Sequence, residues 1–496
     1  METKNTAEKA VEKKPIPLKS CIFTFVFLLV AILIITIPLG ANIAIALMVG
    51  SLAAILVAIR AGYSWNELID NITEAVKTVA IAFLIMFVIG MVISEWMLGG
   101  IIPSMIYYGL QILSPKIFMV ATMIICAIFS MSTGSSWSTV GTVGIALFGV
   151  GAGLGMPPAM TAGAIISGAY FGDKLSPLSD STILTATAAG ISVFEHMRHM
   201  MHTAVPSYII SMGVMAVISN RYIQTSGGVA DTTTVDLYCE TIASTYHVSL
   251  LNLLPIFVVI LVIIFKIPTL PGLLLVAATG AVYAAVFQGA SLIQIINVAY
   301  SGMGSIGIST GVDVIDSLLK RGGISSMLGS TVTLISCITY AGIMQSGNML
   351  KTIVDTLMKY AKRDRDVVLF TMLTSVMFLL STGATHANHI LIGTMYKDYY
   401  KERGIALRNL SRASEDMGTS IQALIPYTSS TIYIVGALGV AMVAYAPYAV
   451  WLYIHPVVAF ACCLLGIDIP KQEYPETKPE YLEEIRSGKV RVVKSN

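Results

Sequence analysis

The chain has 496 residues; 55% of them are hydrophobic, only 12% are charged, and the formal net charge is +2. Its mean hydropathy of +0.79 is far too high for a water-soluble globular protein with an ordinary charged surface. So small a net charge also offers no electrostatic basis for binding nucleic acid. We therefore expect an integral membrane protein embedded in the lipid bilayer.

Long apolar stretches recur along the whole chain. They occupy residues 20–37, 41–60, 76–98, 117–131, 203–219, 249–266, 270–288, 324–345, 366–380, 427–444 and 447–467. Most are near the length of about 20 residues that a helix needs to cross the hydrocarbon core of a bilayer. Because they are continuous and do not alternate between apolar and polar residues, they do not indicate a transmembrane β-barrel. The sequence predicts an all-α polytopic membrane protein.

Basic residues are distributed unevenly around these stretches. Those before the first stretch are Lys4, Lys9, Lys13, Lys14 and Lys19, and those after the last are Lys471, Lys478, Arg486, Lys489, Arg491 and Lys494. The polar segment 220–248 has Arg221 as its basic residue, beside three acidic ones. Cytoplasmic loops carry the excess of Lys and Arg. We expect a protein of the cytoplasmic (inner) cell membrane with cytoplasmic tails 1–19 and 468–496 and an external linker 220–248.

The first polar interruption is "STGSSWST", directly after an apolar stretch. Unwound backbone in hydrocarbon is costly, so it persists only where it is buried in protein or lines a wet cavity. A glycine permits the turn, and hydroxyl groups can satisfy the freed backbone groups. We expect a cavity lined by Ser132, Thr133, Gly134, Ser136 and Thr139. The alternative is a simple kink in which the hydroxyls bond back to their own helix.

The second interruption is "GDKLSPLSDST", in which Asp173 and Asp180 flank Pro177. Ionisable residues in an apolar setting are costly and usually functional. A carboxylate with hydroxyl oxygens such as that of Ser176 can bind Na⁺, and burial favours a neutral carboxyl group, so a proton can compete for the same site. We expect Na⁺ at Asp173 and Asp180. The alternative is that Lys174 neutralises a neighbouring acid in a structural pair.

An internal repeat connects these interruptions to the second half of the chain. A second "STG" stands at Ser381-Thr382-Gly383, 249 positions after the first (381 − 132 = 249), and at this offset Pro177 aligns with Pro426. We expect duplicated units at 20–219 and 249–467. With an external linker between them, the two units would be inverted and contain broken helices or re-entrant hairpins. The substrate site would lie at their interface near the midplane, as in many secondary transporters.

The second "STG" is followed by two histidines. His386 and His389 are three residues apart on one face of a predicted helix, with Thr385 and Asn388 adjacent. Neutral imidazoles there could line the cavity, bind a carboxylate substrate or sense pH. The local sequence offers too few ligands for a metal site.

Other ionisable residues are weaker candidates. Glu415 and Asp416 could bind the cation or a proton, or could form an interfacial charge cluster with Arg408 and Arg412. Glu95 could work or could snorkel to the membrane surface. The residues that we interpret as a solvated amphipathic turn are Glu195, His196, Arg198, His199 and His202.

The motifs carry a family resemblance. The strings "GAYFGDKLSPLSDST" at 168–182, "SSWSTVGT" at 135–142, "NLSRASEDMGTSIQALIPYTSSTIYIVGALGV" at 409–440 and "YAPYA" at 445–449 are similar to the NhaC-type sodium/proton antiporter family. That family belongs to the ion-transporter superfamily, which includes malate/lactate exchangers and amino-acid transporters. The resemblance runs over most of the chain. Tyr427 stands where members often have Trp.

Together these observations predict a secondary transporter that exchanges Na⁺ for H⁺ by alternating access. Within the same family, the alternative is a Na⁺- or H⁺-coupled exchanger of small organic acids or amino acids. A membrane enzyme is the alternative from another class, but no persuasive nucleophile–base or metal motif supports it. We expect no cofactor besides the transported Na⁺ and H⁺. A homodimer is left open.

Overall fold

A computed structural model describes residues 16–36, 38–226, 232–265, 267–307, 310, 316, 320–345, 349–487 and 491–493. The described residues are almost entirely helical, and their only β-structure consists of isolated bridges at Lys471 to Ile405 and Val492. This confirms the predicted all-α class. The predicted tail 1–19 lies mostly outside the described residues.

The helices before residue 227 form the first half of the molecule. They are α1 (Leu18–Thr36), α2 (Ile43–Arg60), α3 (Trp65–Leu98), α4 (Ile101–Ile112), α5 (Pro115–Thr133), α6 (Ser136–Thr139), the π-helical turn η1 (Val140–Gly144), α7 (Ile145–Gly153), α8 (Pro158–Lys174), α9 (Asp180–Ala189) and α10 (Val193–Ser226). Local sequence explains several starts. Ser64 and Glu67 form a capping box that begins α3, and prolines stand in the first turns of α5 and α8.

The remaining helices form the linker, the second half and the C-terminal segment. They are α11 (Thr232–Thr245), η2 (Leu250–Leu253), α12 (Pro255–Ile264), α13 (Thr269–Phe287), α14 (Leu292–Ser301), η3 (Met303–Ile306), η4 (Ile324–Met327), α16 (Leu328–Gln345), α17 (Met349–Met358), α18 (Asp364–Thr382), α19 (Thr385–Glu402), α20 (Leu407–Gly418), η6 (Gln422–Leu424), α21 (Ser429–Leu438), α22 (Met442–Tyr445), η7 (Ala446–Tyr448), α23 (Trp451–Leu465) and α24 (Pro479–Arg486). The predicted linker 220–248 is therefore largely helical where it is described.

Eight of the described helices are long and apolar enough to cross a membrane, and there are up to eleven spans if each of three bent helix pairs counts as one. The chain is a multi-pass membrane protein. The predicted stretch 427–444 is not one helix, because α21 ends at Leu438 and α22 begins at Met442. It instead belongs to two bent pairs, one formed with α20 and the other with α23.

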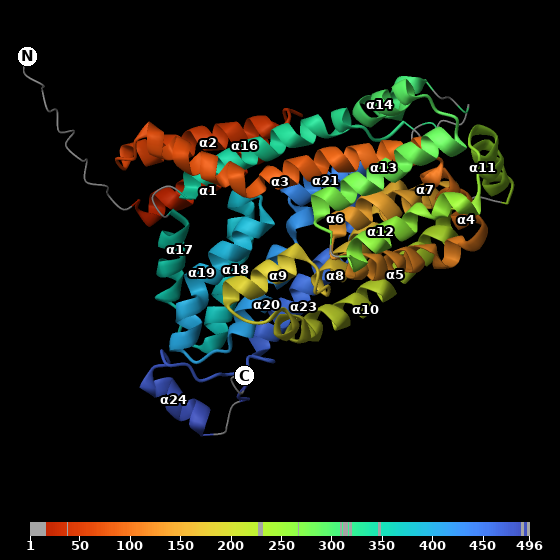
Figure 1. Cartoon of the computed structure of the whole chain (residues 1–496). Helices are drawn as coiled ribbons and strands as arrows, with labels where there is room; N and C mark the ends of the chain where they lie inside the picture. Colours follow the sequence, from red (N-terminus) through yellow and green to blue (C-terminus); the bar gives the residue numbers. More distant parts are fainter. Residues whose placement is uncertain are drawn as a thin grey trace, which may run out of the picture.

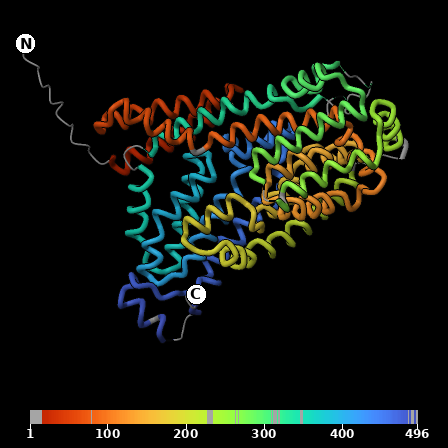
Figure 2. Tube along the Cα trace, viewed as in Figure 1, coloured from red at the N-terminus to blue at the C-terminus, as the bar shows by residue number. Residues whose placement is uncertain are grey.

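The helices form two layers (Figure 1). The long helices α1, α2, α3, α13 and α16 pack together in the upper layer, so the start of the chain lies beside its middle third (Figure 2). Below them, α5, α8 and α10 pack together, as do α18, α19 and α20. The broken helices of both halves lie in this lower layer.

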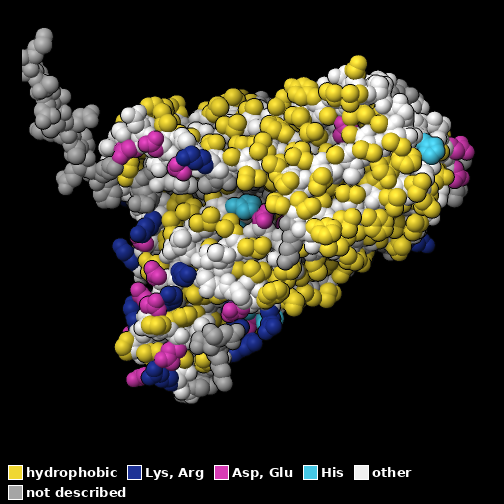
Figure 3. Space-filling view, in the orientation of Figure 1, with side chains coloured by type: hydrophobic (Ala, Val, Ile, Leu, Met, Phe, Trp, Pro, Cys, Tyr) yellow, Lys and Arg dark blue, Asp and Glu magenta, His cyan; other side chains and the backbone are white. Residues whose placement is uncertain are grey.

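The two ends of the molecule differ. Helix α11 packs on α4 at one end, whereas α17 packs on α1 and α24 lies beyond them at the other (Figure 1). Hydrophobic side chains cover most of the face seen in Figure 3, and charged side chains gather at the end that carries α24. An apolar surface bounded by charge is what a membrane-embedded protein presents.

Helix bounds recur at the offset found in the sequence. Helices α5 and α18 begin and end 249 positions apart, and so do α9 and α21. The stretch from α6 to α7 (136–153) matches α19 (385–402) in the same way. Helices α4 and α17 also stand at nearly corresponding positions of the two sequence repeats. In space, however, they lie at opposite ends of the molecule (Figure 1).

Candidate functional site

Both "STG" motifs break a helix. Gly134 follows the last residue of α5 with φ 66° and Gly383 follows the last residue of α18 with φ 59°, both in the left-handed region that favours glycine. A Cβ on Gly134 would lie 2.6 Å from the carbonyl carbon of Leu178 in the second break. The two interruptions of the first half therefore touch each other, and only glycine fits between them.

The two halves make the same hydrogen bond after the break. Ser136 donates to Oδ2 of Asp173 at 2.7 Å, and Thr385 donates to Oε1 of Gln422. Each donor and its acceptor stand 249 positions from their counterparts. One half therefore places a carboxylate, and the other half a neutral amide, at the corresponding position.

A second pair of hydrogen bonds repeats in the same way. Thr182 donates to the carbonyl oxygen of Asp173 at 3.5 Å, and Thr431 donates to that of Gln422 at 3.0 Å. Ser430 donates to Oε1 of Gln422 at 2.6 Å. In each half, one hydroxyl thus bonds the side chain and another bonds the backbone carbonyl of the same residue, Asp173 or Gln422; we call each arrangement a cage.

The two cages are neighbours. Nε1 of Trp137 donates to Ser430 at 3.4 Å, and the Trp137 ring stacks on Tyr433 with centroids 4.7 Å apart. The Tyr170 hydroxyl is buried near Ser136 and Ser430 but forms no hydrogen bond within 3.5 Å among the described residues. A ligand or a water molecule could satisfy this buried hydroxyl.

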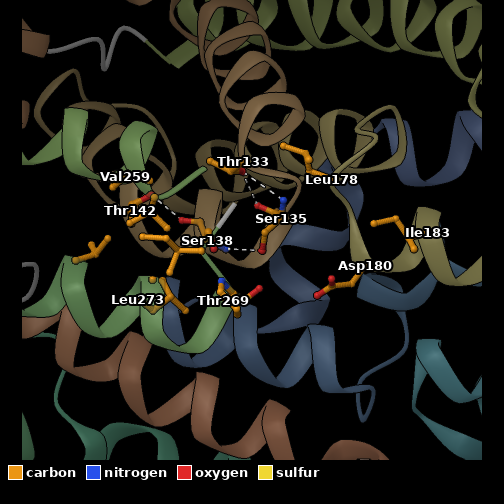
Figure 4. Close-up of a pocket in the computed structure, with 15 residues that line it drawn as sticks. Thr133, Ser135, Ser138, Thr142, Leu178, Asp180, Ile183, Val259, Thr269 and Leu273 are labelled. Carbon is orange, nitrogen blue, oxygen red and sulfur yellow. Dashed lines mark hydrogen bonds between the residues drawn. The ribbon is translucent and has the colours of Figure 1, made fainter. Parts of the chain in front are cut away.

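A cavity of about 240 Å³ adjoins the first break. Figure 4 shows Ser135 and Ser138 of the break facing it, with Asp180 at the start of α9 and Thr269 of α13 on other sides. Apolar side chains of α12 and α13, including Val259, complete the wall. Of the residues expected to line a cavity here, Thr133 does so, and the other polar residues that line it from this stretch are Ser135, Ser138 and Thr142.

The structure separates residues that the sequence grouped together. Asp173 is buried, whereas Asp180 is exposed to the cavity. Ser176 is buried and its hydroxyl accepts a hydrogen bond from the N–H of Leu178, so it supports the turn at Pro177. The carboxylates of Asp173 and Asp180 therefore stand in different environments.

Several predicted lining residues bond within their own segment. Ser132 donates to the carbonyl of the residue four positions before it, and so does Ser381. Thr139 donates to the carbonyl of Ser135 at 2.9 Å. Thr133 and Thr382 each accept a hydrogen bond from the N–H two residues later. These hydroxyls satisfy the broken backbone. Pro426 lies in the turn between η6 and α21.

Lys174 crosses from the first half to the second. Its ammonium group donates to the carbonyl oxygen of Glu415 at 2.7 Å and to Ser420 at 2.9 Å, and it lies 3.0 Å from Nε2 of His455 and 3.8 Å from Asp416. It is fully buried. Lys174 therefore pairs with Asp416 of the second half and not with the neighbouring acid that the sequence alternative named.

Glu415 and Asp416 each pair with a buried histidine. Oε2 of Glu415 lies 2.6 Å from Nε2 of His196, and Oδ1 of Asp416 lies 2.9 Å from Nε2 of His455. Asp416 also accepts a hydrogen bond from Thr203 at 3.2 Å. Of the two arginines in the proposed charge cluster, Arg412 lies 3.9 Å from Asp416.

The "THANH" residues diverge in environment. His389 is buried between Ser414 at 2.9 Å and Thr419 at 3.2 Å. His386 is exposed, so the two imidazoles do not form one surface. Asn388 is buried and donates to Ser375 at 2.9 Å, and its amide oxygen has no partner among the described residues.

Two interpretations from the sequence need correction. The predicted solvated turn is wrong for His196 and His199, whose side chains are buried against α20 and the segment after α23. Glu95 does not snorkel, because it is buried where α3 packs on α13.

Sequence reasoning missed Gln422, Tyr170 and His455 as parts of the site. The repeat alignment could have identified Gln422, since it places this residue opposite Asp173. No sequence motif pointed to His455. This residue lies at the site because α23 packs on α10 and α20.

Comparison with known proteins now identifies the family. The family model described as the Na⁺/H⁺ antiporter family matches residues 15–219 and 168–467. The chain belongs to the Na⁺/H⁺ antiporter family. It is therefore a secondary antiporter, in agreement with the predicted transporter class.

Individual members of the Na⁺/H⁺ antiporter family differ in their substrates. The chain is 37% identical over 424 residues to the malate-2H(+)/Na(+)-lactate antiporter of Bacillus subtilis, covering 86% of this chain and 89% of that protein. It is 34% identical over 412 residues to the Na(+)/H(+) antiporter NhaC of Alkalihalophilus pseudofirmus, covering 82% and 87%. It is 31% identical over 419 residues to the arginine/ornithine antiporter ArcD of Halobacterium salinarum, covering 84% and 85%.

Proposed function

We propose that this antiporter exchanges Na⁺ for H⁺ and that one cation binds between the two cages, next to Asp173. The observation that carries the proposal is the repeated hydrogen bond, Ser136 to Asp173 in one half and Thr385 to Gln422 in the other. The ligand atoms would be oxygens of Asp173, Ser136, Tyr170, Ser430 and Gln422. An all-oxygen set suits a hard cation such as Na⁺. Na⁺ and H⁺ here are substrates.

The balance of buried charge supports exchange of one cation for one proton at this place. The buried charged residues around Lys174 are the acids Asp173, Glu415 and Asp416 and the base Arg412. The buried residues Glu95, Asp316 and Lys471 lie outside this cluster. With the histidines neutral, three negative and two positive charges leave one negative charge. Since an unbalanced buried charge is costly, a single Na⁺ or a single proton would neutralise the cluster, and the two would compete.

Asp173 is the favoured cation ligand, and Asp180 is the favoured entry group. Asp173 is buried among hydroxyl groups, whereas Asp180 faces the cavity. A carboxylate at the cavity wall would attract a cation from water and pass it inward to the cage. Glu415 and Asp416, paired with histidines, are better suited to hold protons.

Inverted repeats would provide the alternating access. The matched helix bounds support a duplication, and the positions of α4 and α17 at opposite ends support inversion. The excess of basic residues before α1 and after α23 favours cytoplasmic tails and an external α11, with the protein in the cytoplasmic membrane.

Flux through reconstituted liposomes tests the proposal. We expect an imposed Na⁺ gradient to drive proton movement, reported by a pH-sensitive dye inside the liposomes. Asp173→Asn should abolish most of this flux, because it keeps the size of the side chain but removes its charge. Asp236→Asn, at an exposed position of α11, is the matched control and should behave as the parent. Parent-like flux in Asp173→Asn would contradict the assignment.

A second candidate function is exchange of a small organic acid or amino acid. The buried, unpartnered amide oxygen of Asn388 favours it, because an amide could bind an ammonium or carboxyl group of a substrate. The names of the malate/lactate and arginine/ornithine relatives are also consistent with it.

Counterflow of labelled malate, lactate, arginine and ornithine distinguishes the two candidates. If an organic substrate is carried, Asn388→Ala should weaken its transport by about 1–3 kcal/mol of binding, whereas the exposed control Asn220→Ala should not. Absence of saturable organic flux in the parent would leave Na⁺/H⁺ exchange as the function.

A further inference from the structure

Three histidines lie one turn apart on α10 and differ steeply in exposure. The side chain of His202 is 49% exposed, that of His199 is 1% exposed and that of His196 is fully buried. Residues three apart on a helix are neighbours on its surface. The three imidazoles therefore form a row from the surface of the protein into the interior.

Asp468 joins the outer two histidines. Its Oδ2 lies 2.5 Å from Nδ1 of His202 and 3.2 Å from Nδ1 of His199. The same carboxylate accepts hydrogen bonds from Arg412 at 3.0 Å and Arg491 at 2.8 Å, so it is held in place from several sides. Asp468 has φ 58° and is the non-glycine residue with positive φ in the described part of the chain.

Asp468 lies just after α23, outside the membrane-spanning helices. Burial alone would raise the pKa of its carboxyl group, but hydrogen bonds from His199 and His202 and the charge of Arg412 hold this pKa well below its usual value. The carboxylate is therefore ionised at neutral pH and can accept a hydrogen bond from either imidazole.

The inner histidine continues the row to the transport site. His196 lies 2.6 Å from Glu415, and Ser181 donates to the other oxygen of Glu415 at 3.4 Å. Ser181 follows Asp180, which lines the cavity. From His202 to His199 and from His196 to Glu415, each step is a hydrogen bond between groups that can gain or lose a proton. No hydrogen bond joins His199 to His196: Nε2 of His199 lies 3.2 Å from Asn409 and Nδ1 of His196 lies 2.9 Å from Ser411, so this step spans one turn of α10.

We propose that His202, Asp468, His199, His196 and Glu415 form the proton pathway between water at the end of the molecule that carries α24 and the buried carboxylates. The pathway rests on the proposed Na⁺/H⁺ exchange and adds the route by which the proton arrives. A proton passes along hydrogen-bonded groups by successive transfer, whereas Na⁺ needs a continuous space. Protons and Na⁺ would thus reach the buried site by different routes.

Several charged groups surround the row. Those near the outer part are Arg408, Arg412, Arg491 and Glu195, and those near the inner part are Lys174 and His389. The positive charges of the arginines near the surface repel a metal cation. The imidazoles beside them still form hydrogen bonds with carboxylates, along which a proton can move. The alternative role for Asp468 is structural: its ion pairs would only hold the C-terminal segment against the rest of the protein.

Two fluxes measured in the same liposomes separate these roles. Na⁺-driven proton flux requires a proton pathway, whereas exchange of ²²Na⁺ for unlabelled Na⁺ requires only the cation site. We expect His199→Gln and His196→Gln to slow the proton flux at least tenfold and to leave Na⁺/Na⁺ exchange near the parent rate. His247→Gln, an exposed histidine near α11, is the matched control and should change neither. Added imidazole should restore part of the proton flux in His202→Ala.

The outcomes are distinct. If the parent shows no Na⁺-driven proton flux, the proposed function itself fails. If the parent shows it and the His196 and His199 variants keep the full rate, the pathway is wrong while the function stands. A shifted pH profile with an unchanged maximal proton flux would also overturn the pathway. Equal losses of both fluxes would assign these residues a structural role and overturn it as well.

Discussion

Replacing Lys174 by Met should destabilise the protein strongly, because it leaves buried acids without their counter-charge. The ammonium group lies 3.8 Å from Asp416 and has no exposed surface. At an effective dielectric constant of about 20, two unit charges at this distance attract each other by about 4 kcal/mol. Breaking a buried pair by removing one partner typically costs about 3–5 kcal/mol. We expect Lys174→Met to lower the free energy of unfolding by this amount.

A double-variant cycle tests the reasoning. Adding Asp416→Asn to Lys174→Met removes the stranded charge and should recover much of the lost stability. Thermal unfolding of the purified protein in detergent provides the measurement. Lys359→Met, at an exposed position, is the control and should unfold with the parent. Equal stability of Lys174→Met and the parent would refute the account, as would a double variant no more stable than the single one.

Three further predictions address the break, the topology and the C-terminal contact. Gly134→Ala should lower the unfolding temperature, because a left-handed alanine costs about 1–2 kcal/mol and its Cβ would clash, whereas Gly213→Ala has open space and should not. In a variant without native cysteines, a cysteine replacing Asp236 should react with a membrane-impermeant maleimide in intact cells, and one replacing Lys478 only after permeabilisation; the reverse pattern would refute the orientation. Because the pKa of the Asp468 carboxyl is depressed in the folded state, its stabilising contribution is present above about pH 4 and is lost as the pH falls towards the folded value. Limited proteolysis of the C-terminal segment should therefore increase in acid, and Asp468→Asn should remove that dependence.

The sequence predicts the helical class and the breaks well, because both follow from local chemistry. Apolar stretches long enough to span a bilayer have few alternatives to a helix. Each "STG" glycine ends its helix in the left-handed conformation, as the adjacent hydroxyl residues suggested. The fixed offset between Gly134 and Gly383 also anticipates matching helix bounds.

The composition of the site could be predicted only in part, because long-range packing determines it. Asp173, Glu415 and Asp416 stand out as acids in apolar segments. The partners of these acids come from distant helices: His196 lies 219 positions before Glu415, and Lys174 contacts residues more than 240 positions away. The charged residues and histidines at the start of α10 have the spacing of a solvent-exposed helical turn. Nothing in the local sequence shows that α20 packs against this turn and buries its histidines.

Titration of Na⁺ binding to the purified protein is the sharpest test of a cation site at Asp173. We expect saturable binding to the parent and, for Asp173→Asn, a loss of about 3 kcal/mol for an interaction with a charged group, or about 100-fold in affinity. Adding Gln422→Glu to Asp173→Asn places the charge in the matching cage and should restore part of the binding. Parent-like affinity in Asp173→Asn, or no recovery when Gln422→Glu is added to a folded Asp173→Asn variant, would contradict a single cation site shared by the two halves.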